Sequence, residues 1–153
     1  NVAMTEIAIT PLTLPDAHEL APLVAAYAQD QKRGAPREPD EFYAELLLKD
    51  RTAELLGARL GGRLVGFAVF FDLLDTISGM RRGQLDDLFV AQSARGRRIG
   101  HALVAALLEE GRKRAWTEIR WMAPKKPPTA RRLAEEMAAR APVEAFTLAV
   151  ARG

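Results

Sequence analysis

The sequence predicts an α/β protein whose single layered domain is built on a central, twisted mixed sheet flanked by helices. Three strand patterns in the middle of the chain follow one another through short connections, which is typical of antiparallel hairpins. The later strand patterns alternate with helical patterns, which favours parallel pairing through crossover helices. A sheet that contains both arrangements is mixed, and helices must cover its faces.

The length and composition of the chain fit one globular domain. It has 153 residues, of which 48% are apolar and 27% are charged, so it can bury a core without disulfides or metals. We expect the domain to span residues 4–153, because residues 1–3 precede Met4 and resemble an expression remnant. No internal repeat or low-complexity segment divides the chain.

The composition also excludes several kinds of chemistry. The chain has no cysteine, which excludes disulfides, thiolate metal sites and cysteine nucleophiles and fits a reducing, cytoplasmic setting. The two histidines, His18 and His101, lie on separate predicted helices and indicate no metal site. No apolar run approaches the roughly 20 residues that a membrane-spanning helix needs, so no membrane association is expected.

The first half of the chain predicts one strand, two helices and a hairpin. Asp16 and Asp40 are suitable N-caps, and apolar residues at helical spacing follow each of them. Gly61 and Gly62 separate two apolar strand patterns, which indicates a two-residue hairpin turn. The predicted elements are a strand at 6–10, helices at 16–29 and 40–49, and strands at 53–60 and 64–74.

The second half alternates strands with helices after a polar connection at 75–83. Leu103 and Leu107 lie on one face of a strongly predicted helix, whose last turn holds basic residues at the negative end of its dipole. The predicted elements are a strand at 84–90, a helix at 100–114, a strand at 119–123, a helix from Pro127 or Pro128 to about 140, and a last strand at 143–150.

Residues 85–103 are the most informative stretch, because they predict a strand, a basic glycine turn and the first turn of a helix. Gly96 and Gly100 permit backbone conformations that a side chain would block. The start of the helix offers unpaired N–H groups and a partial positive charge to a phosphate, and the arginines of the turn add to both. The spacing matches neither a Walker loop nor a dinucleotide-binding fingerprint. From spacing alone, a phosphate site and a solvated basic helix cap stay equally open.

Together with the strand before it, this stretch resembles the coenzyme A pyrophosphate loop of the GNAT N-acetyltransferase superfamily. The family pattern is Arg/Gln-x-x-Gly-x-Gly/Ala. Arg95, Ile99 and Gly100 match the family, whereas Arg98 takes the place of the first glycine and the preceding Gly96 partly offsets this change. The order of the predicted elements also agrees with the GNAT fold over the whole chain.

The resemblance implies an acetyl-CoA-dependent N-acetyltransferase, in which a primary amine of a small molecule attacks the acetyl group directly. Backbone groups at the end of the strand would hold the acetyl and pantetheine portion of acetyl-coenzyme A, and the glycine turn would hold the pyrophosphate. The residues implied to bind acetyl-CoA are Leu88, Phe89, Val90, Arg95, Gly96, Arg97, Arg98, Ile99, Gly100 and His101.

Over residues 66–100 the chain is similar to the diamine (spermidine/spermine) acetyltransferase branch, which has Leu-Glu-Asp where this chain has Leu85-Asp86-Asp87. This similarity implies that Asp86 is the catalytic base for the amine proton. Because strand side chains alternate, Asp87 is expected on the opposite face. Asp75 and Asp87 are the expected substrate-binding residues, although an ordinary turn or strand carboxylate accounts for either of them equally well.

The resemblance fails at the residue that protonates the departing thiolate. In the family an Asn after the fifth strand is followed by a Tyr seven residues later, and the corresponding places here are Pro127 and Ala134. Tyr27 and Tyr43, the only tyrosines, lie on earlier predicted helices and are expected in the core or a groove. The alternative function is therefore a GNAT-fold regulator that binds acyl-CoA with weak or no turnover.

The expected partners are a small-molecule amine and a second copy of the chain in a homodimer. Nucleic acid is not expected, because the net charge is only +2 and no recognition motif or aromatic platform accompanies the basic residues. The acceptor stays open between a polyamine, an amino acid and a peptide N-terminus. Acidic residues suited to an ammonium group and the cations Lys32, Arg33 and Arg37 both occur near the loop where the acceptor usually enters.

Overall fold

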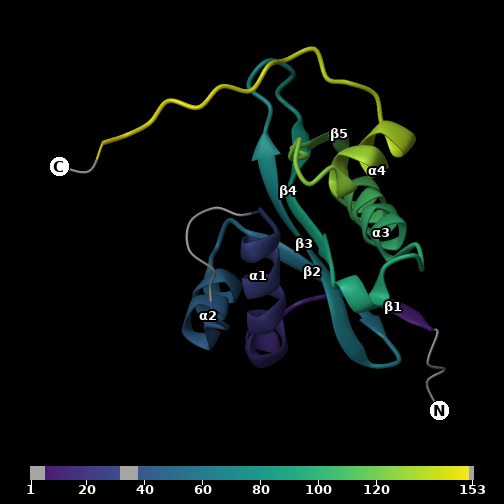
Figure 1. Ribbon diagram of the computed structural model, residues 1–153. Helices are drawn as coiled ribbons and strands as arrows, with labels where there is room; N and C mark the ends of the chain where they lie inside the picture. Colours follow the sequence, from purple (N-terminus) through teal and green to yellow (C-terminus); the bar gives the residue numbers. More distant parts are fainter. Residues whose placement is uncertain (1–5, 32–37, 152–153) are drawn as a thin grey trace.

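The computed structural model describes residues 6–31 and 38–151 of the chain (Figure 1). Two short 3-10 turns, η1 and η2, precede α1 and α3. In chain order the elements are β1 (Ile7–Pro11), η1 (Leu14–Asp16), α1 (Ala17–Gln31), α2 (Glu41–Lys49), β2 (Glu54–Leu60), β3 (Arg63–Leu74), β4 (Arg81–Val90), η2 (Gln92–Ala94), α3 (Ile99–Arg114), β5 (Trp116–Trp121) and α4 (Thr129–Met137).

The strands form one sheet in the order β1-β2-β3-β4-β5. The pairs from β1 to β4 are antiparallel, and β5 pairs parallel to β4. The crossover between β4 and β5 is α3, as a parallel connection requires. The mixed sheet predicted from the element order is therefore confirmed.

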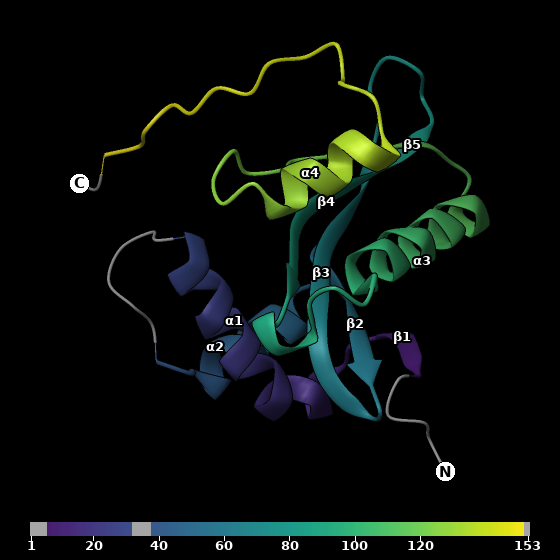
Figure 2. The ribbon, with the colours of Figure 1, turned by 45° about the vertical axis from the view of Figure 1, so that its right-hand side comes forward.

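Helices cover both faces of the sheet. Figure 2 shows α1 and α2 on one side of it and α3 with α4 on the other. Leu20 of α1 packs with Phe67 and Phe89 in one buried cluster. Leu103 and Leu107 of α3, both fully buried, belong to a second cluster on the other face. Both clusters bury alternate residues of the central strands, as the period of two in a strand dictates.

The predicted hairpin between β2 and β3 is confirmed. Gly61 and Gly62 have φ values of 58° and 86°, a left-handed region that suits glycine at both central positions of a two-residue turn. The resulting register pairs Gly57 with Phe67 at the centre of the sheet.

A β-bulge interrupts the pairing of β3 with β4. Val69 pairs with Asp87 and the next residue, Phe70, pairs with Leu85, which leaves Asp86 without a partner on β3. A bulge of this kind resets the alternation of side chains between the two faces of the strand. It lies in the part of β4 that leads into the candidate site.

The predicted last strand, over residues 143–150, is wrong. Residues 139–151 have no regular secondary structure and pair with no strand among the described residues. Their alternating apolar pattern is that of a strand, but a strand also needs a neighbour to satisfy its backbone groups.

Other element boundaries moved by a few residues. The strand β4 begins at Arg81, inside the stretch predicted as a connection, and β5 begins at Trp116 because Ala115 ends α3 in a left-handed conformation, with φ 60°. The helix α4 ends at Met137, earlier than predicted. Within the described residues, no helix is long and apolar enough to cross a bilayer.

Candidate active site

The sheet opens where β4 and β5 separate. Pairing between the two strands ends at Leu85 and Trp121, and the Met122 N–H then donates to the Leu85 carbonyl at 2.9 Å. The strand β4 continues to Val90 with β3 on one side and no strand on the other. Backbone polar groups along this edge are therefore available to a ligand.

A cavity of about 380 Å³ occupies this opening. Its walls come from the end of β4, the turn that leads into α3, the last part of α1, and α4 with the loop before it. Every residue that the sequence assigned to acetyl-CoA lines the cavity except Arg97, which is exposed outside it. The structure thus brings together Leu88, Phe89, Val90, Arg95, Gly96, Arg98, Ile99, Gly100 and His101.

The turn into α3 depends on two left-handed residues. Gly96 has φ 81°, and no heavy atom lies within 4 Å of the place where its Cβ would be, so that side of the turn is open. Arg98 is the N-cap of α3 with φ 59° and ψ 28°. A glycine would take that conformation without strain, which explains why the family prefers glycine where this chain has Arg98.

The N-terminus of α3 has unused donors at the cavity wall. Arg98 makes no side-chain cap, and the Ala102 N–H donates to the Arg98 carbonyl at 3.1 Å. The N–H groups of the helical residues before Ala102 therefore have no partner within the helix, and the helix dipole adds positive potential there. This arrangement can bind an anionic group such as a pyrophosphate.

Arg95 is held against the cavity by three contacts. Its Nε donates to the Val90 carbonyl at 3.2 Å, and its Nη2 lies 3.9 Å from an Asp30 carboxylate oxygen. Its guanidinium also lies over the Phe89 ring, 5.9 Å from the centroid. The charge is thereby positioned between the end of β4 and the turn.

The helix α4 closes another wall of the cavity. A Cβ on Gly100 would lie only 3.0 Å from Leu133 Cδ2, so the absence of a side chain at Gly100 allows α4 to approach α3 closely. His101 Nε2 lies 3.2 Å from a Glu136 carboxylate oxygen, without hydrogen-bond geometry. Ala134, where the family has its Tyr, lies on α4 but does not line the cavity.

Tyr27 is the residue of the site that sequence reasoning missed. It lies on α1, lines the cavity, and donates a hydrogen bond from its hydroxyl to Asp87 Oδ1 at 2.8 Å. Its ring packs edge-on against Phe67 and at a tilt against Phe89, with centroids 5.8 and 5.5 Å away. The sequence offered one signal for Tyr27, which is that the chain has only two tyrosines.

Asp86 and Asp87 lie toward the same face of the sheet, which corrects the expectation of opposite faces. Asp87 reaches Tyr27 on α1, and Asp86 accepts from Gln84 Nε2 at 3.0 Å. Successive side chains of a strand point to opposite faces of the sheet. Because Leu85 is buried on the α3 side, the neighbouring Gln84 points toward α1. The bulge at Asp86 is the reason. Both residues are half-buried, and neither lines the cavity.

Asp75 lies in the turn between β3 and β4 and not at the cavity. It accepts from the Ser78 N–H at 3.3 Å, and hydrogen bonds from Ser78 lower the pKa of its carboxyl. Its own N–H donates to the Met80 carbonyl at 2.7 Å. These contacts give Asp75 a role in holding the turn.

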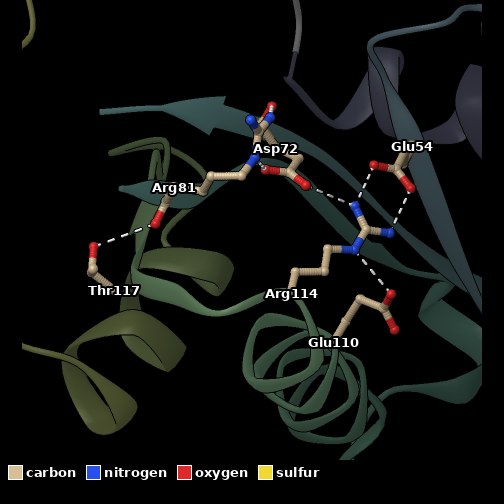
Figure 3. Close-up of polar contacts among 6 residues, drawn as sticks. All are labelled: Glu54, Asp72, Arg81, Glu110, Arg114 and Thr117. Carbon is tan, nitrogen blue, oxygen red and sulfur yellow. Dashed lines mark hydrogen bonds and ion pairs between the residues drawn. The ribbon is translucent and has the colours of Figure 1, made fainter. Parts of the chain in front are cut away.

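A second polar cluster, away from the cavity, surrounds Arg114 at the end of α3 (Figure 3). Its guanidinium donates two bonds of 2.7 Å to Glu54, one of 3.0 Å to Glu110 and one of 3.3 Å to Asp72. The bonds to Glu54 are the main cause that raises the pKa of Arg114. Partial burial alone would raise the pKa of the Asp72 carboxyl. The hydrogen bonds from Arg81 and Arg114 have the larger combined effect, so the net pKa is lowered.

Comparison with known proteins identifies the class of protein. The model of the acetyltransferase (GNAT) family matches residues 20–138, most of the chain. The chain therefore belongs to the GNAT acetyltransferase family, whose members use acetyl-CoA as cosubstrate. The resemblance of the sequence to the GNAT superfamily is confirmed. No curated protein matches the chain.

Solved structures of acetyltransferases are similar to the chain. A ribosomal-protein-alanine N-acetyltransferase from Brucella melitensis biovar Abortus 2308 is 45% identical, with a TM-score of 0.89, over 95% of this chain and 100% of that one. An aminoglycoside acetyltransferase, HMB0005, from an uncultured soil metagenomic sample has 22% identity and a TM-score of 0.77, over 95% and 99% of the two chains. The second likeness shows the shared fold alone.

Proposed function

We propose that the protein is an N-acetyltransferase that transfers an acetyl group from acetyl-CoA to a primary amine. The single observation that supports this most is the cavity between the separated ends of β4 and β5, with the α3 N-terminus and Tyr27 both in its wall. When bound there, acetyl-CoA supplies a thioester that an amine can attack. The protein's own residues must hold both reactants in contact and move two protons.

The residues in the cavity wall fit the chemical groups of coenzyme A. The open turn at Gly96, the free N–H groups of α3 and the guanidinium of Arg95 suit a pyrophosphate. The edge of β4 at residues 88–90, which does not pair with β5, suits the amide groups of pantetheine, which can add hydrogen bonds as a strand would. Arg97, outside the cavity, would contribute charge only.

Asp86 is the proposed base for the amine proton. An ammonium group must lose a proton before its nitrogen can attack, and a carboxylate beside the cavity can accept that proton directly or through water. Asp86 lies at the bulge of β4, and its carboxylate accepts a hydrogen bond from Gln84. Asp87 is proposed to act on the substrate side, through its hydrogen bond with Tyr27.

Tyr27 is the proposed donor of the second proton, in place of the tyrosine that the family has where this chain has Ala134. Among the described residues of the cavity wall it has the only phenolic hydroxyl. Packing against Phe67 and Phe89 fixes its ring, and at rest its hydroxyl proton is held by Asp87. To protonate the departing thiolate, the hydroxyl would turn its proton from Asp87 to the sulfur and become a phenolate, which takes a proton from solvent before the next turnover.

The replacement Tyr27→Phe tests this assignment, since it removes the hydroxyl and keeps the ring. We expect kcat to fall by about 100-fold, a typical contribution of one positioned acid or base, with little change in the KM for acetyl-CoA. Steady-state thiol release measures both constants. Tyr43→Phe, at the other tyrosine, is the matched control and should keep the wild-type kcat. A Tyr27→Phe enzyme with wild-type kcat would rule out Tyr27 as the proton donor.

The acceptor is proposed to be a small-molecule amine, with a peptide N-terminus as the second candidate. The second candidate is favoured by the 45% identical structure, whose name describes acetylation of an alanine of a ribosomal protein. The cations Lys32, Arg33 and Arg37, expected near the entrance for the acceptor, lie outside the described residues. The alternative function, an acyl-CoA-binding regulator without turnover, rests on Ala134 and is weakened if Tyr27 replaces the missing tyrosine.

A panel of amines assayed for thiol release from acetyl-CoA tests the proposed function. The panel should contain polyamines, amino acids, aminoglycosides and short peptides that begin with alanine. We expect one class to be acetylated far above hydrolysis, and Asp86→Asn to lower its kcat. Tight coenzyme A binding with no release from any amine would support the regulator instead. Failure to bind coenzyme A at all would overturn both functions.

A further inference from the structure

Arg82 on β4 is a partly buried cation without a partner among the described residues. Its Nε is buried and has no hydrogen-bond acceptor within reach, and no carboxylate of the described chain forms an ion pair with its guanidinium. The other arginines of β4 and β5 are paired. Arg81 lies 2.7 Å from Asp72, and Arg120 lies 3.0 Å from Glu118. A partly desolvated charge without a partner is unfavourable, so a ligand that supplies the partner is favoured at Arg82.

The charge of Arg82 reaches Asp75, in the β3–β4 turn, without direct contact. Hydrogen bonds from Ser78 are the main cause that lowers the pKa of Asp75, and the charge of Arg82 adds a smaller effect at longer range. The Asp75 carboxylate already accepts a hydrogen bond from the Ser78 N–H at 3.3 Å. Asp75 is therefore not the missing partner, and the terminal nitrogens of Arg82, which are not buried as its Nε is, stay open to a ligand.

Strand pairing places Arg82 on the α1 side of the sheet, in line with Gln84. Gln84 pairs with Phe71, which packs against the buried cluster on the α1 side. Arg82 pairs with Leu73, two residues further along β3, and residues two apart on a strand share a face. In Figures 1 and 2, α1 and α2 lie beside the other end of the sheet, and β3 and β4 extend beyond them toward their turn. The two helices therefore leave this part of the face uncovered.

The same face carries Asp86, the proposed base, further along β4. Arg82 lies four positions before Asp86. At about 3.3 Å per residue of strand, with one residue in a bulge, the two positions are roughly 10–13 Å apart. Toward Val90 the strand leads into the cavity proposed for acetyl-CoA. An acceptor whose amine reaches Asp86 must therefore extend in the other direction, toward Arg82.

We propose that Arg82 binds a carboxylate of the acceptor, and that this carboxylate lies roughly 10 Å from the reacting amine. An extended peptide advances about 3.3–3.6 Å per residue, so a tripeptide has this spacing between its amine and its C-terminal carboxylate. A guanidinium can bind a carboxylate through two parallel hydrogen bonds, and partial desolvation strengthens the attraction. The inference rests on the proposed function and narrows its acceptor. Polyamines and aminoglycosides carry no carboxylate and would not use Arg82.

Two peptides that differ only in the terminal carboxylate test this assignment by steady-state thiol release. With acetyl-CoA saturating, we expect kcat/KM for trialanine to exceed that for trialanine amide by about tenfold, the effect of one charge-assisted hydrogen bond. Arg82→Gln should abolish this difference through a higher KM for trialanine, with the KM for acetyl-CoA unchanged. Arg63→Gln is the matched control, because it removes the same charge from an exposed arginine at the start of β3 and should keep the difference.

The length of the acceptor tests the spacing between the amine and the carboxylate. Alanine and dialanine are too short for their carboxylates to reach Arg82 from an amine at Asp86. We therefore expect Arg82→Gln to lower kcat/KM for trialanine and to leave the values for the two shorter acceptors as they are in the wild type. An equal effect of Arg82→Gln on all three acceptors would overturn the proposed spacing.

Calorimetric titration makes the same comparison without turnover. Trialanine and trialanine amide are titrated into the protein with coenzyme A bound, and Arg82→Gln should remove the preference for the free acid. Equal affinity of the wild type and Arg82→Gln for trialanine would overturn the assignment of Arg82. If another class of amine is nevertheless acetylated, the proposed function stands and only its narrowing fails. A protein that acetylates no amine loses the proposed function, and the titration then decides on Arg82 alone.

Discussion

Arg98 determines how the turn enters α3. Its backbone is left-handed, a conformation that costs a residue with a side chain about 1–2 kcal/mol relative to the right-handed region. The same geometry turns the first N–H groups of α3 toward the cavity wall. The chain therefore keeps the backbone conformation of the family loop and gains an additional cation there, at the cost of local backbone strain.

Replacing Arg98 by glycine should stabilise the fold and weaken binding of coenzyme A. We expect the free energy of unfolding to rise by roughly 0.5–1 kcal/mol, because glycine adopts φ 59° without strain. Urea unfolding measures the stability and isothermal titration measures the affinity.

Arg97→Gly is the matched control, since Arg97 is exposed and is not among the left-handed residues of the described chain. It should not gain stability, because glycine only adds freedom to the unfolded chain there. An equal gain in both variants would contradict the assignment of strain to Arg98.

At the scale of elements, Arg114 joins the end of α3 to the sheet. Its partners Glu54 and Asp72 lie on β2 and β3, and Glu110 lies one turn earlier on α3 (Figure 3). The guanidinium also stacks near Phe70 and Trp116, 5.5 and 5.6 Å from their centroids. One side chain therefore links three elements that hold β4, and so the site, in place.

Removing this guanidinium should destabilise the protein well beyond an ordinary surface change. For Arg114→Met we expect a loss of about 1–3 kcal/mol, because three carboxylates lose a common partner in a partly exposed cluster. Arg112→Met is the control. Arg112 forms an ion pair with Glu109 on the exposed face of α3, and its replacement should cost no more than about 0.5 kcal/mol. Equal losses in urea unfolding would contradict a special role for Arg114.

The same cluster should make the stability of the fold depend on pH in the acidic range. The pKa of Asp72 is lower in the folded protein than in the unfolded chain, where it is near 4. The charged carboxylate therefore stabilises the fold at any pH above the unfolded-state pKa, and this contribution is lost as the pH falls through the lower pKa of the folded state. We expect the free energy of unfolding to fall between pH 5 and pH 3. Asp72→Asn should be less stable at neutral pH and show a shallower slope in acid. An unchanged slope would show that Asp72 is not responsible.

At the scale of the whole molecule, the cavity lies between parts that the sequence keeps far apart. Tyr27 belongs to α1 on one face of the sheet, and Leu133 and Glu136 belong to α4 on the other. A ligand in the cavity would therefore contact both layers and join them. No residue of α4 is buried, so α4 has the most to gain from such a ligand.

Coenzyme A should therefore stabilise the whole fold. At a concentration 100 times its Kd we expect the free energy of unfolding to rise by about 2.7 kcal/mol, as for any ligand that binds only the folded state. Thermal unfolding measured at several concentrations gives the Kd. Pantetheine, which lacks the pyrophosphate, is the control and should stabilise much less at equal concentration. Equal effects of both ligands would show that the α3 N-terminus does not bind the pyrophosphate.

The order of elements as far as α4 and the glycine turn could be predicted from the sequence, because both depend on local chemistry. Gly61 and Gly62 specify their turn by conformation alone, and helical spacing specifies α3. The position of Tyr27 could not be predicted, because it depends on how α1 packs across β4. The relation of Asp86 to Asp87 was predicted wrongly, because a bulge in one strand is specified by its neighbour.

The sequence by itself determined the mixed sheet, through the periodicity and order of its elements. Its resemblance to the GNAT loop, over a continuous stretch of chain, indicated the class of the protein and all but one of the residues proposed there to bind coenzyme A, Arg97 being outside the cavity. Only the tertiary structure decided which tyrosine lines the cavity, where the two carboxylates lie and that residues 139–151 pair with no strand of the described chain. Each of these is a contact between distant segments, and no local pattern encodes such a contact.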